Sequence, residues 1–341
     1  MQTPIKVTVE SPSNIAIVKY WGKKGHQLPM NASMSFTLSE AKTIMEIHYT
    51  PADSFSLEFL FEGNINSKFE KKIEKKLMEF AADLPFILKG KFQISSRNTF
   101  PHSTGIASSA SAMSALAFGI SQIAVQLDYL STDQLLQMSS HLARIGSGSA
   151  SRSLFPYASV WGENVIFKAA KNEYAIGIEA SLHPLFKTLH DAILIVDDQE
   201  KSVSSTVGHE LMNGHPHRES RLKFAEMNLQ KLVKALSAGD FATFAEVSEH
   251  EALDLHSMMM TSTPSYILLA PESLAIINKI REFRTLTQEK ITFTIDAGPN
   301  IHVLYPLESK EKVELFLETL YNAGLCKKII KDRVGTGPKA I

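Results

Sequence analysis

Alternating apolar and polar residues open the chain. Ile5, Val7 and Val9 recur at every second position, which is the period of a strand that buries one face. The apolar run at 15–18 continues this character beyond Pro12, an imino acid that interrupts regular strands. The pattern therefore predicts that two strands open the protein.

A different spacing follows at residues 68–80. Phe69, Ile73, Leu77 and Phe80 recur at intervals of four, four and three, so that they share one face of a helix. Lysines and glutamates fill the positions between them. We expect an amphipathic helix here, with its charged residues on a solvated face and without a binding role.

Two segments of small residues interrupt the pattern in the middle of the chain. A strand at 92–96 leads into the first segment, 101–111, and a helix is expected from Ala112 to Ile123. The second segment, 146–153, follows a helical pattern at 134–145. Loops of this composition let a backbone approach a ligand closely.

Strands and helices are also mixed in the second half, after a plausible boundary near 184–190. We expect strands over 192–196, 291–295 and 301–305, and helices over about 221–238, 241–260, 272–284 and 309–322. Mixing of this kind in both halves predicts an α+β fold. A length of 341 residues favours two domains, which we assign to 1–187 and 188–341.

The charge balance limits the classes of partner. The chain has 35 Lys plus Arg and 36 Asp plus Glu, so it lacks the basic excess of a general nucleic-acid or anionic-membrane binder. We also find no run of roughly 20 apolar residues and no signal peptide. With Cys326 as the only cysteine, no intrachain disulfide can form, and a cytoplasmic location is expected. An anionic ligand would have to bind at a local site.

The first small-residue segment has the composition of a phosphate-binding loop. A glycine- and serine-rich loop that opens a helix exposes backbone N–H groups at the positive end of the helix dipole. Ser108, Ser109 and Ser111 can add hydroxyl groups for phosphate oxygens or a magnesium ion. The segment is neither a Walker A loop nor a GxGxxG fingerprint. A loop that only caps and packs the helix remains the alternative.

Two charged residues have an environment suited to catalysis. Asp296 lies between an apolar strand and the turn 297–300, so its carboxylate can project from a strand end and act as a base. Arg152 lies among serines in the second loop, and a guanidinium can hold a carboxylate with two hydrogen bonds. The alternatives are an aspartate that caps the turn and an arginine in an ordinary salt bridge.

Several segments carry a resemblance to a known family. PHSTGIASSASAMSALA resembles the ATP-binding loop of the GHMP kinase superfamily. Within that superfamily, the chain is similar to the mevalonate diphosphate decarboxylases in four segments: SPSNIAIVKYWGK (11–23), GSGSASRSLF (146–155), VSSTVG (203–208) and DAGPN (296–300). They occur in the family's order over nearly the entire chain, and KYWGK and DAGPN distinguish the decarboxylase branch.

The resemblance implies a fold and a reaction. The expected fold has an N-terminal ribosomal-protein-S5-like α/β domain and a C-terminal ferredoxin-like domain, with both ligands in the cleft between them. The implied reaction is the decarboxylation of mevalonate 5-diphosphate to isopentenyl diphosphate, with ATP and Mg²⁺ and with release of ADP, phosphate and carbon dioxide. Relatives are commonly homodimers, so a homodimer is expected here as well.

The resemblance also implies roles for individual residues. The ATP contacts are Pro101, Ser103, Gly105, Ala107, Ser108, Ser109 and Ser111, with Ser109 near the magnesium ion. Asp296 is the base and Arg152 holds the departing carboxylate. Lys19 and Asn14 match positions near the reacting carboxylate and hydroxyl, and Ser205 matches one near phosphoryl transfer. The diphosphate contacts are Tyr20, Lys23, Ser147 and Ser149.

Two departures from the family fall on the diphosphate side. Thr206 stands where some bacterial relatives carry arginine, and the link from Lys23 to Pro29 is shorter than in the family, so that Lys24 could substitute for a lost basic contact. These departures leave open a decarboxylase of mevalonate 5-phosphate. A plain kinase of the superfamily and a nucleotide-binding regulator are the further alternatives.

The histidines match no metal motif. His209, His215 and His217 have no zinc-ligand spacing, and His250 with His256 misses the HExxH spacing. We expect none of them to bind a metal.

Overall fold

The first strand of the protein is longer than the sequence suggests. The computed structural model describes residues 3–100, 108–199 and 203–341. Strand β1 runs without interruption from Ile5 to Val18, and its pairing shifts by a bulge between Pro12 and Asn14. The expectation of two separate strands is therefore wrong. A bulge accommodates the residue that has no N–H, so the proline bends the strand without ending it.

The N-terminal half is built on an eight-stranded sheet. Its strands follow the order β14-β1-β4-β7-β5-β6, and β8 and β9 extend from β4. Besides β1, they are β4 (Ser33–Pro51), β5 (Ser56–Phe61), β6 (Asn64–Ile65), β7 (Gly90–Asn98), β8 (Ala158–Trp161), β9 (Ala175–Gly177) and β14 (Lys339–Ala340). A separate hairpin joins β2 (Lys23–Lys24) to β3 (Leu28–Pro29).

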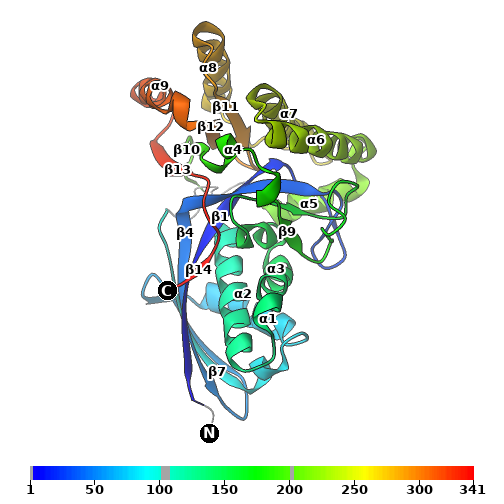
Figure 1. The fold of residues 1–341 in the computed structure, drawn as a ribbon, viewed down its shortest axis with the longest axis vertical. Coiled ribbons are helices and arrows are strands. Elements are labelled where there is room, and N and C mark those ends of the chain that lie inside the picture. The colour runs from blue at the N-terminus through cyan, green and yellow to red at the C-terminus, as the bar shows by residue number, and fades with distance from the viewer. Residues whose placement is uncertain (1–2, 101–107, 200–202) are drawn as a thin grey trace.

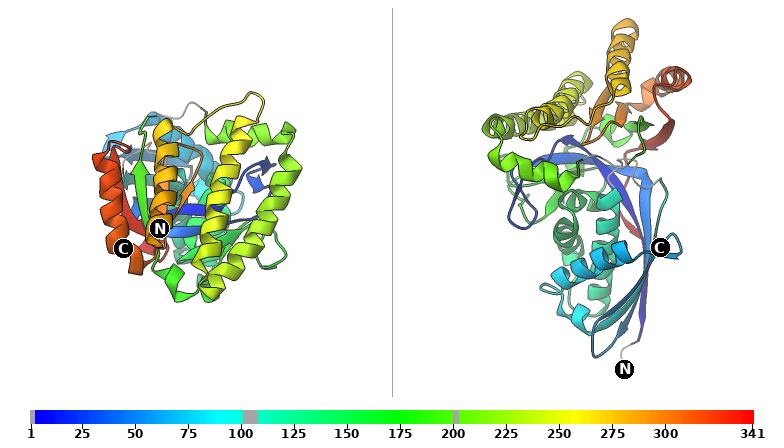
Figure 2. Two further views of the ribbon diagram at one scale, coloured as in Figure 1. Left: turned by 90° about the horizontal axis from the view of Figure 1, so that it is seen from above. Right: turned by 180° about the vertical axis from the view of Figure 1, so that it is seen from behind.

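Three helices cover one face of this sheet, as Figures 1 and 2 show. They are α1 (Ser67–Phe80), α2 (Ser108–Gln126) and α3 (Leu135–Gly146). The apolar face predicted for α1 is confirmed, because Ile73, Leu77 and Phe80 are buried against the sheet. By length and composition alone α2 could cross a membrane, but it is mostly buried as the core helix of this half. Its apolar character is explained by that burial.

The second half contains a four-stranded antiparallel sheet. Its strands are β10 (His190–Ile195), β11 (Thr292–Ile295), β12 (Ile301–Tyr305) and β13 (Lys328–Arg333). They lie in the order β11-β12-β10-β13, the antiparallel arrangement expected for a ferredoxin-like domain. Helices α8 (Pro271–Thr287) and α9 (Lys310–Asn322) pack on it. The mixed helix and strand composition predicted for both halves is confirmed.

A shared core joins the two halves. Helices α6 (Arg218–Ala238) and α7 (Phe241–Met260) contribute buried residues to one cluster with β1, β4 and β10. The short helix α4 (Pro184–Lys187) adds Phe186 to it, and α5 (Ser205–Leu211) follows β10 along the chain. The last strand, β14, returns to pair with β1. The division at residue 187 falls between α4 and β10 and stays a prediction.

Candidate active site

A cleft of about 550 Å³ lies where the two halves meet. Its wall combines the end of β1, helix α1, the start of α2, the second small-residue segment, helix α5 and the turn after β11. The lining residues that carry polar or charged groups are Lys19, Tyr20, Trp21, Lys23, Gln27, Lys72, Lys76, Ser108, Ser109, Ser147, Ser149, Arg152, Ser204, Ser205, Thr206, His209 and Asp296. The structure thus gathers most of the candidate residues in one place.

An ion pair lies at the base of the cleft. The Lys19 ammonium donates to Asp296 Oδ1 at 2.8 Å and to the carbonyl of Ala16 at 2.6 Å. The Lys19 side chain is only 2% exposed, whereas that of Asp296 is 33% exposed. Burial lowers the pKa of Lys19, and the Asp296 carboxylate opposes this shift. The aspartate therefore presents a lysine-bound carboxylate to the cleft, rather than only capping its turn.

A buried network holds this pair from behind. Glu251 of α7 accepts the backbone N–H of Lys19 at 2.8 Å, two bonds from Arg221 of α6 at 2.7 and 2.9 Å, and one from Asn228. Arg221 also donates to the Lys19 carbonyl. His256 Nε2 donates to the Asp296 carbonyl at 3.1 Å. The main chain on both sides of the ion pair is thus fixed by side chains of α6 and α7.

Arg152 faces the cleft from a 3-10 helix, Gly148–Leu154. The side chain is 3% exposed, it donates to the Ser33 hydroxyl, and its Nε has no hydrogen-bond partner among the described residues. Burial lowers the pKa of Arg152 to about 10, and the charge of Asp296 raises it. An unpaired donor on a buried guanidinium is costly unless an anion accepts from it. The expectation of an ordinary salt bridge is not met in the described part of the chain.

Tyr20 and Lys23 line the side of the cleft next to Arg152. The Tyr20 hydroxyl is buried and has no partner among the described residues, and burial raises its pKa. Gly148 lies directly beside it, since a Cβ there would approach the Tyr20 hydroxyl at 3.0 Å and the Trp161 ring at 2.8 Å. Burial also lowers the pKa of Lys23, which Glu210 opposes.

Helix α1 contributes two lysines that sequence reasoning assigned to a solvated face. Lys72 and Lys76 line the cleft, one helical turn apart. Lys76 also donates to Glu79 at 2.8 Å and to the carbonyl of Ile145 at 3.0 Å, which ties it to the last turn of α3. Desolvation beside the cleft and then the charges of Lys76 and Lys68 lower the pKa of Lys72. The structure therefore places these two residues of the charged run in the cleft wall, where the sequence pattern predicted only a solvated face.

The predicted ATP loop is only partly within the described structure. Pro101, Ser103, Gly105 and Ala107 lie outside the described residues. Ser108 and Ser109, the first residues of α2, line the cleft. Ser111 does not reach it: the side chain is fully buried and bonds to Thr43 at 2.7 Å and to the carbonyl of Ser108. One turn into the helix, its hydroxyl faces the sheet instead of the ligand.

One predicted substrate contact supports the loop behind the cleft and does not line the cleft itself. Asn14 is 3% exposed, donates to the carbonyl of Ser149 and to the Ser153 hydroxyl, and is not part of the cleft wall. Ser147, Ser149, Ser205 and Thr206 do line the cleft.

Lys24, proposed as a substitute for a lost basic contact, is exposed on the β2–β3 hairpin and is not part of the cleft wall. Lys23 thus lines the cleft, whereas Lys24, its neighbour on the hairpin, is exposed.

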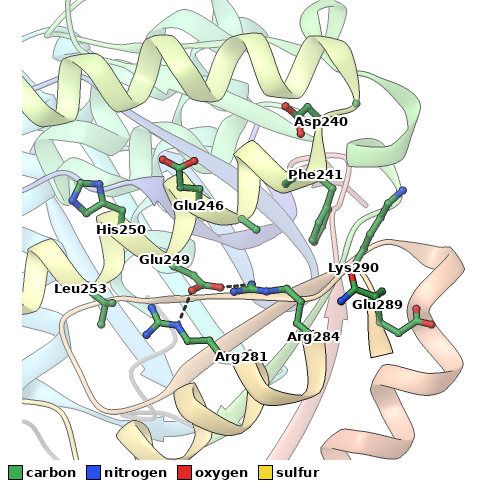
Figure 3. A pocket seen from close by; sticks show the side chains of 14 residues that line it. Asp240, Phe241, Glu246, Glu249, His250, Leu253, Arg281, Arg284, Glu289 and Lys290 are labelled. Atoms are coloured by element: carbon green, nitrogen blue, oxygen red, sulfur yellow. Dashed lines mark hydrogen bonds and ion pairs between the residues drawn. The ribbon is translucent and has the colours of Figure 1, made fainter. Parts of the chain in front are cut away.

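A larger hollow, of about 870 Å³, lies between α7 and α8 (Figure 3). Within it Glu249 accepts from Arg281 at 3.1 Å and from Arg284, which also donates to the carbonyl of Ile291. The residues of the predicted site do not line this hollow. The volume of a cavity therefore does not identify the candidate active site, because the smaller cleft contains the reactive groups.

Comparison with known proteins decides the family. A model described as the diphosphomevalonate decarboxylase-like N-terminal domain matches residues 11–168, and one for the mevalonate 5-diphosphate decarboxylase C-terminal domain matches residues 192–333. A diphosphomevalonate decarboxylase of Ganoderma lucidum is 30% identical over 92% of this chain and 82% of the relative. The chain belongs to the diphosphomevalonate decarboxylase family. A Saccharomyces cerevisiae member is 29% identical over 97% of this chain and 86% of the length of that relative.

Solved structures of the family have the same fold. Mevalonate diphosphate decarboxylase from Staphylococcus aureus superposes with a TM-score of 0.86 at 29% identity, covering 99% of this chain and 98% of that one. A structure described as MDDEF in complex with MVAPP, AMPPCP and magnesium gives 0.83 at 27% identity, with 99% of each chain covered. The two-domain GHMP kinase fold expected from the sequence is thereby confirmed.

Proposed function

We propose that this chain catalyses the ATP-dependent decarboxylation of mevalonate 5-diphosphate to isopentenyl diphosphate. The chain's family supports this reaction, and a solved relative binds MVAPP, an ATP analogue and magnesium. The observation that carries the proposal is the Lys19–Asp296 pair, which joins residues 277 positions apart at the base of a cleft containing Arg152 and three serine-rich segments.

Asp296 is proposed as the base. A tertiary alcohol is a poor nucleophile, and a carboxylate within hydrogen-bond reach can orient it and accept its proton. The Lys19 ammonium fixes the carboxylate at 2.8 Å, while the bond from His256 holds the backbone of the same residue. Together these contacts limit the positions that the base can adopt, which lowers the entropic cost of reaching the reactive geometry.

Arg152 is proposed to hold the carboxylate that leaves as carbon dioxide. Its buried Nε has no partner among the described residues, so a substrate carboxylate could satisfy it. The charges of Arg152 and Lys19 both interact with Asp296. The acid end of the substrate would therefore lie beside the base, with the hydroxyl between them.

The opening of α2 and the lysines of α1 fit the phosphates of ATP. When bound, ATP with Mg²⁺ supplies the phosphoryl group that turns the hydroxyl into a leaving group. Ser108 and Ser109 offer hydroxyls at the N-terminus of a 19-residue helix, and Lys72 and Lys76 offer positive charge in the same cleft. Ser109 is the proposed neighbour of the magnesium ion, and Ser205 is the proposed side chain near the transferred phosphoryl group.

The diphosphate end of the substrate would lie along Tyr20, Lys23, Ser147 and Ser149. The unpaired Tyr20 hydroxyl and the desolvated Lys23 ammonium both gain from an anionic acceptor there. Mevalonate 5-phosphate is the second candidate, because Thr206 adds no charge to this side and Lys24 lies outside the cleft wall. The homodimer and the cytoplasmic location stay predictions.

The test is to incubate purified protein with magnesium-ATP and, separately, mevalonate, mevalonate 5-phosphate and mevalonate 5-diphosphate. We expect ADP and carbon dioxide in equal amounts with the diphosphate, and far less turnover with the others. Release of ADP without release of carbon dioxide would identify a kinase. Higher turnover with mevalonate 5-phosphate than with the diphosphate would support the second candidate function.

A further inference from the structure

His209 is a cleft residue to which the proposed reaction gives no role. It comes from α5, and its ring packs between two aromatic rings, with centroids 4.4 Å from Tyr20 and 4.6 Å from Trp21. The side chain is only 6% exposed, yet it lines the cleft. Its orientation is therefore fixed by packing before any ligand binds.

One ring nitrogen of His209 is already engaged. The backbone N–H of Gly22 donates to Nδ1 at 3.0 Å, so Nδ1 is the acceptor and carries no hydrogen in the neutral ring. The hydrogen then lies on Nε2. Among the described residues Nε2 has no hydrogen-bond partner, and it is not sealed from solvent. A single oriented N–H donor is thus left facing the cleft.

The surroundings keep this donor uncharged. Burial first, and then the charges of Lys23 and Arg152, lower the pKa of His209 well below its ordinary value. A protonated imidazole would repel both cations, whereas a neutral N–H adds a hydrogen bond without repulsion. The ligand group that such a donor fits is an oxygen of an anion already attracted by Lys23.

We propose that His209 binds the phosphorylated end of the substrate, with Nε2–H donating to a phosphate oxygen beside Lys23 and Tyr20. This inference rests on the proposed function. It makes His209 a specificity-determining contact on the side where Thr206 supplies no charge. The competing explanation is that His209 only supports the turn at Gly22 through Nδ1.

Two substitutions separate these roles, because each retains one end of the imidazole. His209→Asn places an amide oxygen near the position of Nδ1, so the bond from Gly22 can persist while the cleft donor is lost. His209→Gln places an amide N–H near the position of Nε2, so the donor persists while the Gly22 contact is lost. Binding of mevalonate 5-diphosphate and, separately, of an ATP analogue is measured by calorimetry for both variants.

We expect His209→Asn to raise Kd for the diphosphate roughly tenfold or more, the usual effect of one hydrogen bond to a charged group. His209→Gln should stay within about threefold of wild type, and the ATP analogue should bind all three proteins alike. Wild-type affinity in the asparagine variant would overturn the proposal. Equal weakening in both variants, or weakening in the glutamine variant alone, would assign the residue to support and also overturn it.

A spectroscopic readout follows His209 in the wild-type protein, once the absence of its signal from the His209→Asn spectrum has identified it among the twelve histidines. In wild-type protein labelled with ¹⁵N-histidine, the Nε2–H signal of His209 should shift downfield when the diphosphate is added, and an unchanged signal refutes the contact. Carbon dioxide release by the same preparation is followed in parallel. Absence of release disproves the proposed function, whereas release with an unchanged His209 signal disproves this inference alone.

Discussion

The buried pair of Arg221 and Glu251 allows a sharp test of what holds the active site in place. Both side chains are 0% exposed and joined by bonds of 2.7 and 2.9 Å. The substitution Arg221→Met removes the cation and leaves the Glu251 carboxylate buried, with only Asn228 and the Lys19 N–H as donors among these contacts. Removing one partner of a buried pair typically costs about 3–5 kcal/mol of unfolding free energy. Domains of ordinary size have only about 5–15 kcal/mol in total, so the loss should be large.

A double variant separates stability from function. In Arg221→Met/Glu251→Leu the fully buried pair is gone and the carboxylate that remains, Asp254, is 22% exposed; hydrophobic replacements of buried pairs are often close to neutral in stability. The Lys19 backbone, however, loses its bonds to both Glu251 and Arg221. We therefore expect most of the stability to return, while kcat remains low because the main chain that carries the Lys19 ammonium is no longer fixed.

The assay is urea denaturation at pH 7 together with kcat for carbon dioxide release. Arg281→Met is the matched control, because the Arg281 side chain is 44% exposed and pairs with Glu249 far from the cleft. That substitution should cost no more than about 1 kcal/mol. A loss below about 1 kcal/mol for Arg221→Met, or a double variant as unstable as the single one, would refute the reasoning.

The remaining predictions concern the cleft. Asp296→Asn should abolish carbon dioxide release while an ATP analogue still binds by calorimetry, because an amide cannot accept the alcohol proton; near-normal turnover would contradict the assigned role. Lys72→Met and Lys76→Met should each raise KM for ATP several-fold, whereas Lys75→Met, one position away on α1 and exposed, should not. Gly148→Ala should lower stability by about 1–3 kcal/mol in a thermal melt, since its Cβ would meet Trp161 at 2.8 Å. Burial lowers the pKa of Lys23, so a bound anion should raise it again; diphosphate binding at alkaline pH should take up protons, seen as a binding enthalpy that depends on the buffer.

Periodicity predicted the helices well where one face is apolar and the other charged. Helix α1 is an example, because its buried residues Ile73, Leu77 and Phe80 recur at intervals of four and three, and Phe69, four positions earlier, is partly buried. The predicted strands do not include β4, the 19-residue strand at the centre of the sheet, although Met34, Phe36 and Leu38 alternate with polar residues along it. Ser33, Ser35 and Thr37 are fully buried there, so both faces of this part of the strand are buried, whereas alternation is typical of a strand whose polar face is solvated. Thr37 can be buried because its hydroxyl donates to the carbonyl of Phe155, a partner that only the folded chain supplies.

The residues of the site likewise fall into those that a short sequence motif indicates and those that only a contact between distant segments reveals. Contiguous motifs identified Asp296, Arg152 and the lysines after β1. Glu251, which fixes Lys19, lies 232 residues further along the chain, and no local pattern connects the two. Lys72 and Lys76 have the same sequence neighbourhood as Lys71 and Lys75, and only the packing of α1 beside the cleft distinguishes them.

The distribution of charge gives Asp296 an electrostatic role besides the proposed catalytic one. The chain has a net charge of -1, yet Lys19, Lys23 and Arg152 are all desolvated around one cleft, and burial lowers the pKa of each. Asp296 is a counter-charge for both Lys19 and Arg152. Until an anionic substrate arrives, that carboxylate opposes the desolvation of two cations at once. The proposed base therefore also stabilises the cations of the proposed anion site, and a substrate that carries its own carboxylate and phosphates would take over the same compensation when it binds.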